Sequence, residues 1–194
     1  MAGAAPRMQP ATVADLLAIP EGERFHEIVD GELVRKALPS IRHGMAQMGI
    51  GDAITGPYGP RARGRGPGGW LFASEVEITL DAVQVYRPDV AGWRKERLPS
   101  LPAGTPIVVR PDWVCEILSG SNAQNDLVKK MRGYQSGEVP HYWVLDPDAE
   151  TLTVHRWTFE GYLVVQTAAG AERIRPEPFG EIEISVLELV VGDV

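Results

Sequence analysis

Residues 112–118 (DWVCEIL) constrain the fold most, because after Asp112 this run is apolar on both faces of a strand except for one glutamate. Runs of this kind form central strands that other elements cover on both sides. By period-two counting, Glu116 shares a face with Val114 and Leu118. A buried carboxylate without a partner is costly, so Glu116 must meet a cation, a metal or a set of hydrogen bonds. The run therefore predicts a covered sheet with a carboxylate near its centre.

Length and composition fit one globular domain. The chain has 194 residues, of which 44% are hydrophobic and 23% are charged. A chain of this size can bury roughly 70% of the surface that it exposes when unfolded. We therefore expect residues 1–194 to form a single domain, with a disordered start over 1–11 and a flexible Arg/Gly loop over 57–69.

Charge and cysteine content narrow the classes of partner and compartment. The chain carries 19 Lys and Arg residues against 26 Asp and Glu residues, a net charge of −7, so any contact with nucleic acid must be local. Cys115 is the only cysteine, which excludes an intrachain disulfide and favours a reducing compartment. No apolar run approaches the ~20 residues of a membrane span, and the N-terminal residues do not resemble a secretory signal. We expect a cytoplasmic protein without membrane contact.

Local patterns predict a mixed order of helices and strands. Thr12 with Asp15 forms a capping box for a short helix over 11–19. Asp30-Gly31 between two half-apolar runs is a strong signal for a β-hairpin. The other expected elements are a helix over 40–56, adjacent antiparallel strands over 70–80 and 82–93, a helix capped by Ser121 that ends at Gly137, a strand meander over 141–168 and a further strand-type segment over 181–191.

Three carboxylates stand where burial or a strand end is expected. Besides Glu116, Glu27 shares a hairpin face with Val29, and Asp89 follows Pro88, which cannot donate to a sheet ladder. Taken singly, each has a simpler explanation as an ion-pair partner, an edge residue or a turn. If the three converge, oxygen ligands favour Mg²⁺ or Mn²⁺, ions that activate water and neutralise charge on a phosphate.

The motifs of several other chemistries are missing from the sequence. GxxxxGK[ST], GxSxG and HExxH do not occur, and the four histidines are too scattered to predict a zinc site. His43 by itself is most simply a solvated or hydrogen-bonded helix histidine, and Cys115 is most simply a core residue. These absences leave the carboxylates as the main candidates for chemistry.

Five segments, taken in order, resemble the Uma-type family of restriction endonucleases, a branch of the PD-(D/E)XK nuclease superfamily. They are FHEIVDGELV, His43, RPDV, DWVCEILSGSN and DLVKKMRGYQSGEVPHYWVLDP. The resemblance covers about residues 12 to 190 and is most specific between Val114 and Pro147. It implies an α/β, restriction-endonuclease-like core, a mixed β-sheet flanked by helices, here with an N-terminal hairpin and a C-terminal β-meander. It also implies a Mg²⁺- or Mn²⁺-dependent endonuclease that hydrolyses phosphodiester bonds.

The resemblance assigns roles to the carboxylates. Asp89, Glu116 and the main-chain carbonyl of Ile117 would hold the metal, and Glu27 would place another carboxylate near it. The sequence departs from the superfamily at the lysine, because the position two residues after the glutamate is Leu118.

The family pattern moves this lysine to the following helix. The chain has four lysines, and Lys130 matches better than Lys129, although the sequence leaves the choice between them open. The lysine would orient or deprotonate the attacking water, or stabilise the charge on the phosphate.

The expected substrate is nucleic acid, DNA rather than RNA. Arg61, Arg63 and Arg65, with His43, are the candidate substrate contacts, although an Arg/Gly loop is as often merely a solvated segment. The alternative function is a non-catalytic module on the same fold that binds nucleic acid or protein. A homodimer stays open, because symmetric dimers are common among soluble proteins.

Overall fold

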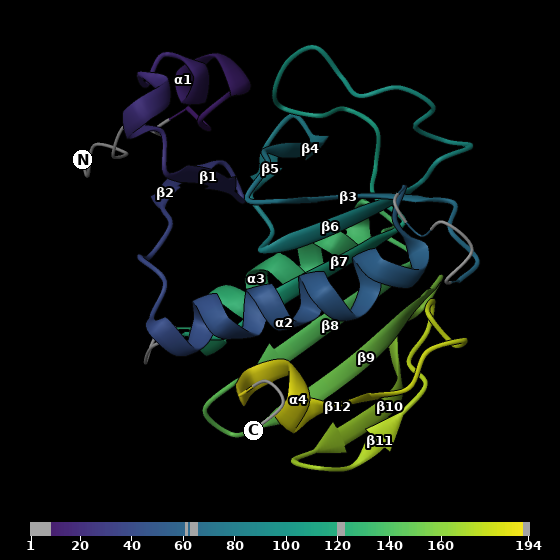
Figure 1. The fold of residues 1–194 in the computed structure, drawn as a ribbon. Helices are drawn as coiled ribbons and strands as arrows, with labels where there is room; N and C mark the ends of the chain where they lie inside the picture. Colours follow the sequence, from purple (N-terminus) through teal and green to yellow (C-terminus); the bar gives the residue numbers. More distant parts are fainter. Residues whose placement is uncertain (1–8, 61, 63–65, 120–122, 192–194) are drawn as a thin grey trace.

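The computed structural model describes residues 9–60, 62, 66–119 and 123–191. Its largest sheet has six strands in the order β10-β9-β8-β7-β6-β3 (Figure 1). β7 (Trp113–Ile117) and β8 (His141–Asp146) pair in parallel, and the other neighbours in this sheet pair antiparallel. The mixed sheet expected from the sequence is therefore present.

β7 is the covered central strand that its apolar residues predict, since all five of its residues are buried. Cys115 and Ile117 point to one face and pack in the cluster that contains Ile50 of α2 (Ile41–Tyr58). Val114 and Glu116 point to the other face, which α3 (Ala123–Ser136) covers (Figure 1). The alternation along β7 thus directs Glu116 toward α3.

A second sheet has four strands in the order β2-β1-β5-β4, and its first two strands come from the N-terminal segment. β1 (His26–Val29) and β2 (Glu32–Arg35) form the expected hairpin, with Asp30 and Gly31 at φ 51° and 78° in its turn. Positive φ at both positions is what a tight type I′ turn requires, which confirms the prediction made from Asp30-Gly31.

A short helix, α1 (Val13–Leu17), precedes the hairpin and has the capping box of Thr12 and Asp15 that the sequence predicts. A 3₁₀ turn, Glu21–Glu23, follows it. The expected disorder over 1–11 is wrong at its end, because the Ala11 N–H donates a 2.8 Å hydrogen bond to the Gly31 carbonyl. Residues 1–8 lie outside the described residues.

The chain crosses twice between the two sheets over residues 70–94. Each of the long strands expected over 70–80 and 82–93 is in fact two short ones. The first pair is β3 (Trp70–Ser74) and β4 (Ile78–Asp81), and the second is β5 (Gln84–Tyr86) and β6 (Val90–Arg94). β4 and β5 pair in the smaller sheet, whereas β3 and β6 pair in the larger one.

Local backbone features explain both breaks. Glu75 has φ 56°, which ends the extended conformation after β3. Pro88 lacks the N–H that a strand needs, so the ladder stops between β5 and β6. The Glu75 N–H donates to the Pro88 carbonyl at 3.2 Å and ties the two crossings together.

The remaining elements confirm some boundaries and correct others. α2 continues to Tyr58, so the loop expected over 57–69 begins later, and Arg61, Arg63 and Arg65 lie outside the described residues, as does the Ser121 cap. β8, β9 (Thr151–Thr158) and β10 (Gly161–Ala169) form the expected meander.

The last expected element, a strand-type segment over 181–191, is mostly helical. The segment contains the short strand β12 (Ile184–Ser185), which pairs with β11 (Arg173–Ile174), and the helix α4 (Val186–Val191). α4 packs against α2, and Gly49 allows the close approach because a Cβ there would meet the Leu189 carbonyl. In the described part of the chain, no helix has both the length and the apolar character needed to cross a membrane.

Candidate active site

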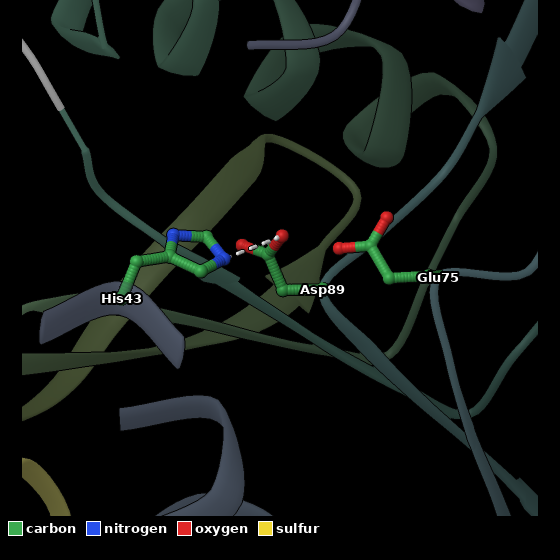
Figure 2. Close-up of side chains that lie close together, drawn as sticks. All are labelled: His43, Glu75 and Asp89. Carbon is green, nitrogen blue, oxygen red and sulfur yellow. Dashed lines mark ion pairs between the residues drawn. The ribbon is translucent and has the colours of Figure 1, made fainter. Parts of the chain in front are cut away.

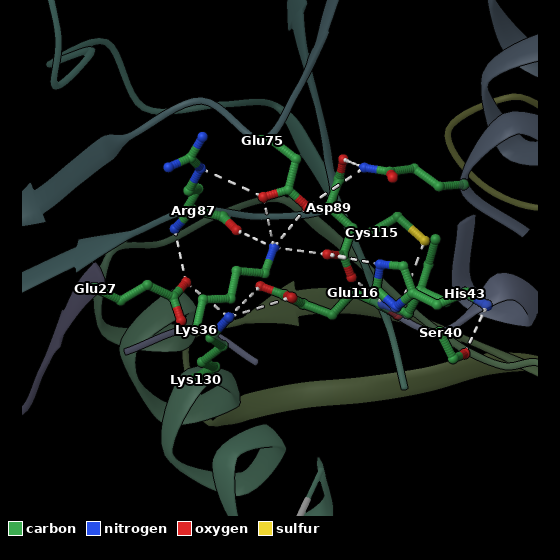
Figure 3. A network of polar contacts seen from close by, with 12 residues as sticks. Glu27, Lys36, Ser40, His43, Glu75, Arg87, Asp89, Cys115, Glu116 and Lys130 are labelled. Atoms are coloured by element: carbon green, nitrogen blue, oxygen red, sulfur yellow. Dashed lines mark hydrogen bonds and ion pairs between the residues drawn. The ribbon is translucent and has the colours of Figure 1, made fainter. Parts of the chain in front are cut away.

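Asp89 and Glu116 meet where β6 begins and β7 ends (Figure 3). Asp89 lies just before β6, and its Oδ2 accepts a 2.6 Å hydrogen bond from the main-chain N–H of Ile117. Both carboxylates are buried, with exposed fractions of 1% for Asp89 and 6% for Glu116. The antiparallel pairing of β6 with β7 therefore brings together two acidic residues that are 27 positions apart in the chain.

Helix α3 supplies Lys130 and Tyr134 to Glu116. The Lys130 Nζ lies 3.2 Å and 3.3 Å from the two carboxylate oxygens of Glu116, and the Tyr134 hydroxyl donates to Oε1 at 2.6 Å. Lys129 is half exposed, and its Nζ is 4.0 Å from Glu32 of the hairpin. The structure thus places Lys130, and not Lys129, against Glu116.

The hairpin contributes Glu27 to the same group. Oε1 of Glu27 lies 2.8 Å from the Lys130 Nζ and accepts a 2.8 Å hydrogen bond from the Arg87 N–H. Glu27 is only 4% exposed, as its place on the inner face of β1 predicts. Lys130 therefore joins a carboxylate of the smaller sheet to one of the larger sheet.

Lys36 and Glu75 belong to the cluster as well, although the sequence analysis did not select either of them. The Lys36 Nζ lies 2.7 Å from Oδ1 of Asp89, 2.9 Å and 3.0 Å from the oxygens of Glu75, and 2.8 Å from the Arg87 carbonyl (Figure 3). Arg87 also pairs with Glu75, at 3.3 Å. The scarcity of lysine was the one available signal for Lys36, because only four occur in the chain.

His43, Glu75 and Asp89 form a group that could ligate a metal (Figure 2). Each offers one ligand atom, and these atoms lie within 4.8 Å of one another. The His43 Nε2 is 3.3 Å from Oδ1 of Asp89, but neither ring nitrogen has a well-formed hydrogen bond within the described residues. A buried imidazole nitrogen without such a bond, next to two carboxylates, is a suitable donor set for a divalent metal ion, and the two carboxylates supply the oxygen ligands that Mg²⁺ and Mn²⁺ prefer.

Burial and neighbouring charges set the protonation of the two central carboxylates in opposite directions. Burial raises the pKa of Glu116 to about 7, because the attraction of Lys130 only partly offsets the loss of water and Asp89 adds repulsion. Burial also acts on Asp89, but the nearby His43 and Lys36 outweigh it and hold the pKa of Asp89 below its usual range. Asp89 is thus the permanently ionised member of the pair.

Both lysines stay charged for the same reason. Burial alone would lower the pKa of Lys130, but Glu116, Glu27 and Asp89 outweigh it and raise that pKa. The pKa of Lys36 is likewise raised, because Asp89 and Glu116 outweigh its burial. Neither lysine is therefore suited to act as a general base near neutral pH.

The cluster lines a cleft of about 280 Å³ between the hairpin and the larger sheet. Its polar lining consists of the carboxylates and lysines together with Arg35, His43, Gln47, Arg87 and Ser119. The apolar lining includes Phe25, Val29, Val34, Leu38, Leu118 and Leu127. The cleft therefore combines charged groups with an apolar lining, as small-molecule sites commonly do.

The family of this chain follows from its match to a family model. Residues 13–187 match the Uma2 model, which is described as "Putative restriction endonuclease". The chain belongs to the Uma2 family. A crystal structure of a "putative nuclease belonging to DUF820" from Anabaena variabilis is similar to this Uma2 protein, with a TM-score of 0.75. The two are 23% identical, over 93% of this chain and 98% of the other. The comparison with curated proteins gives no match.

These matches confirm the restriction-endonuclease-like fold and the family that the sequence motifs indicate. Within this Uma2 protein, Asp89, Glu116, Lys130 and Glu27 lie in one connected network, and His43 joins it through Asp89. Ile117 contributes its N–H to Asp89, and its carbonyl stays a predicted ligand.

Proposed function

We propose that this Uma2 protein is a divalent-metal-dependent endonuclease that hydrolyses phosphodiester bonds in nucleic acid. The main support is the joint placement of Asp89, Glu116 and Lys130 beside one cleft at the end of β7. An ionised carboxylate, a second carboxylate and a fixed ammonium are the groups that metal-assisted phosphodiester hydrolysis requires.

In this proposal Asp89, Glu116 and the Ile117 carbonyl hold Mg²⁺ or Mn²⁺. His43 and Glu75 are additional ligand candidates, because they share Asp89 with that set. The ion would act as a Lewis acid and would lower the pKa of a bound water. Asp89 contributes a permanent negative charge, and Glu116 contributes one once its proton has left.

Lys130 and Glu27 would assist as a fixed pair. Because the pKa of Lys130 is raised, it serves as a hydrogen-bond donor to a phosphate oxygen or to the attacking water, rather than as the base. Glu27 anchors the ammonium from the opposite side at 2.8 Å and so limits its movement. This arrangement favours the orienting and charge-stabilising roles over deprotonation.

The proposed substrate is DNA rather than RNA, approached through a local basic surface. Arg61, Arg63, Arg65 and His43 are the proposed contacts, as the sequence indicates, and the chain as a whole is too acidic to bind nucleic acid by its bulk charge. A homodimer would present two such surfaces, and light scattering on the purified protein measures whether one forms.

A nuclease assay tests the proposal directly. Single- and double-stranded DNA and RNA are incubated with the protein, with and without Mn²⁺, together with the Asp89→Asn variant and the exposed-site control Asp52→Asn. We expect Mn²⁺-dependent cleavage by the wild type and the control, and a loss of at least about 100-fold in Asp89→Asn. Nucleic-acid binding without cleavage, and without stabilisation by Mn²⁺, would instead support the non-catalytic module.

A further inference from the structure

The ammonium group of Lys36 is held as a bound cation would be held. Its Nζ has oxygen neighbours in Glu75, Arg87 and Asp89, all between 2.7 Å and 3.0 Å away. Three hydrogens are available on Nζ, so these contacts use its full donor capacity. The side chain is 16% exposed, and no other lysine in the described residues contacts Asp89 within ion-pair distance.

This position conflicts with a divalent ion on the same carboxylate. A Mg²⁺ ion binds oxygen at about 2.1 Å. An ion on Oδ1 of Asp89 could be no farther from the Lys36 Nζ than this bond length plus the 2.7 Å ion-pair distance. Like charges so close together in a buried site repel strongly. A metal on that oxygen therefore works against the present Lys36 contact, which is the shortest lysine contact to a proposed metal ligand in the described residues.

Lys36 and the Ile117 N–H donate hydrogen bonds to the Asp89 carboxylate, and of these two donors Lys36 is the one that can move away. The Ile117 N–H belongs to the main chain of the buried strand β7 and cannot leave without breaking the sheet. Lys36 follows β2 in a connecting segment, and four single bonds carry its ammonium group. The cleft borders its side chain, so space is available for another rotamer.

We propose that Lys36 is an internal counter-cation that neutralises Asp89 and Glu75 in the metal-free protein and leaves them when a divalent ion binds. The inference depends on the proposed function, because it assumes that Asp89 is a metal ligand. The inference adds that the Lys36 side chain and the ion compete for the carboxylates of Asp89 and Glu75. In such a competition the apparent dissociation constant of the ion is the intrinsic constant divided by the fraction of the protein in which Lys36 has left Asp89.

Calorimetric titration of Lys36→Met with Mn²⁺ tests the competition. We expect at least tenfold tighter binding than in the wild type, because methionine keeps the length of the side chain and removes its charge. Arg35→Met is the matched control, since Arg35 is exposed, borders the same cleft and lies next to Lys36 in the chain. The control should change affinity by less than threefold. Equal or weaker binding by a folded Lys36→Met overturns the inference.

Amine labelling of the wild type provides a second test that does not depend on a variant. Lysines are modified with an amine-reactive reagent with and without saturating Mg²⁺, and peptide mass spectrometry measures the modification of each. We expect Mg²⁺ to increase labelling of Lys36 several-fold and to leave exposed Lys95 unchanged. Unchanged or reduced labelling of Lys36 overturns the inference. If the wild type binds neither ion, the proposed metal site is wrong and the inference fails with it, whereas ion binding without these Lys36 effects removes the inference alone.

Discussion

The Tyr134 hydroxyl donates a 2.6 Å hydrogen bond to the carboxylate of Glu116, from the helical turn that follows Lys130. The carboxylate thus has a neutral donor and a charged donor from the same face of α3. A neutral side chain of the same shape could keep the tyrosine contact. Charge and structure at Glu116 can therefore be separated by one substitution.

Glu116→Gln should abolish divalent-metal binding and leave the fold intact. The amide oxygen can still accept from Tyr134, and the variant no longer buries an ionisable carboxyl. We expect stability equal to or above that of the metal-free wild type at pH 8. Isothermal titration with Mn²⁺ measures the binding, and Glu160→Gln on the surface is the control. Wild-type affinity in Glu116→Gln would show that this residue is not a ligand.

Lys130→Met should destabilise the protein far more than Lys129→Met. Removal of Lys130 leaves Glu27 and Glu116 buried without their shared cation, a loss of roughly 3–5 kcal/mol. Lys129 is half exposed, and its replacement should cost less than about 1 kcal/mol.

Urea unfolding of both variants and of Lys130→Met with Glu116→Gln measures these losses. The double variant should recover part of the stability, because only one carboxylate then lacks a partner. If Lys130→Met and Lys129→Met lost equal unfolding free energy, Lys130 would not be the cation that stabilises the two buried carboxylates.

The raised pKa of Glu116 predicts a pH dependence of stability in the metal-free protein. Its pKa rises from 4.5 to about 7 on folding, so the folded state favours the protonated acid. This contribution is complete below about pH 4.5 and is lost as the pH rises through about 7. Between pH 5 and pH 8 the wild type should therefore lose roughly 1–3 kcal/mol relative to Glu116→Gln, which does not titrate there. Unfolding free energies of both proteins across this range provide the measurement, and parallel curves would contradict the prediction.

The Arg/Gly loop predicts the salt dependence of nucleic-acid binding. If Arg61, Arg63 and Arg65 all contact duplex phosphates, replacing the three together should reduce the slope of log K against log salt by roughly 0.9 × 3, or about 2.7. Metal affinity should not change. An unchanged slope would show that these three arginines do not contact phosphates. The nucleic-acid contacts would then have to be sought at Arg42, Arg94 or Arg97.

Arg42, Arg94 and Arg97 differ in how readily each could contact a phosphate. Arg97 forms an ion pair with Asp112, and Arg42 pairs with Asp148 and Glu150. The Arg94 guanidinium lies over the Trp70 ring. Arg42 is half exposed and its partners are themselves accessible, so it is the arginine most easily released to a phosphate.

The sequence predicts those features that depend on neighbouring residues. Asp30-Gly31 specifies its own turn, and the apolar faces of 112–118 specify a central strand. Asp89 and Glu116 were selected because each breaks a local pattern. Lys130 required the order of motifs from the family resemblance.

The features that the sequence did not predict depend on long-range geometry. Residues 70–80 show one continuous strand pattern. This pattern does not predict that the segment breaks into β3 and β4, which belong to different sheets. Glu75 reaches the site only because of this crossing, and Lys36 reaches it only because the hairpin lies beside the crossing. A strand break with positive φ at a glutamate has no sequence signal comparable to a glycine.

The two crossings between the sheets mean that residues of the site are carried by both sheets. Glu27 and Lys36 are carried by the hairpin of the smaller sheet, and Glu116 is carried by the larger sheet. The crossings meet at the hydrogen bond that the Glu75 N–H donates to the Pro88 carbonyl. Any change in the position of the hairpin would therefore alter the Lys36–Asp89 and the Glu27–Lys130 contacts together.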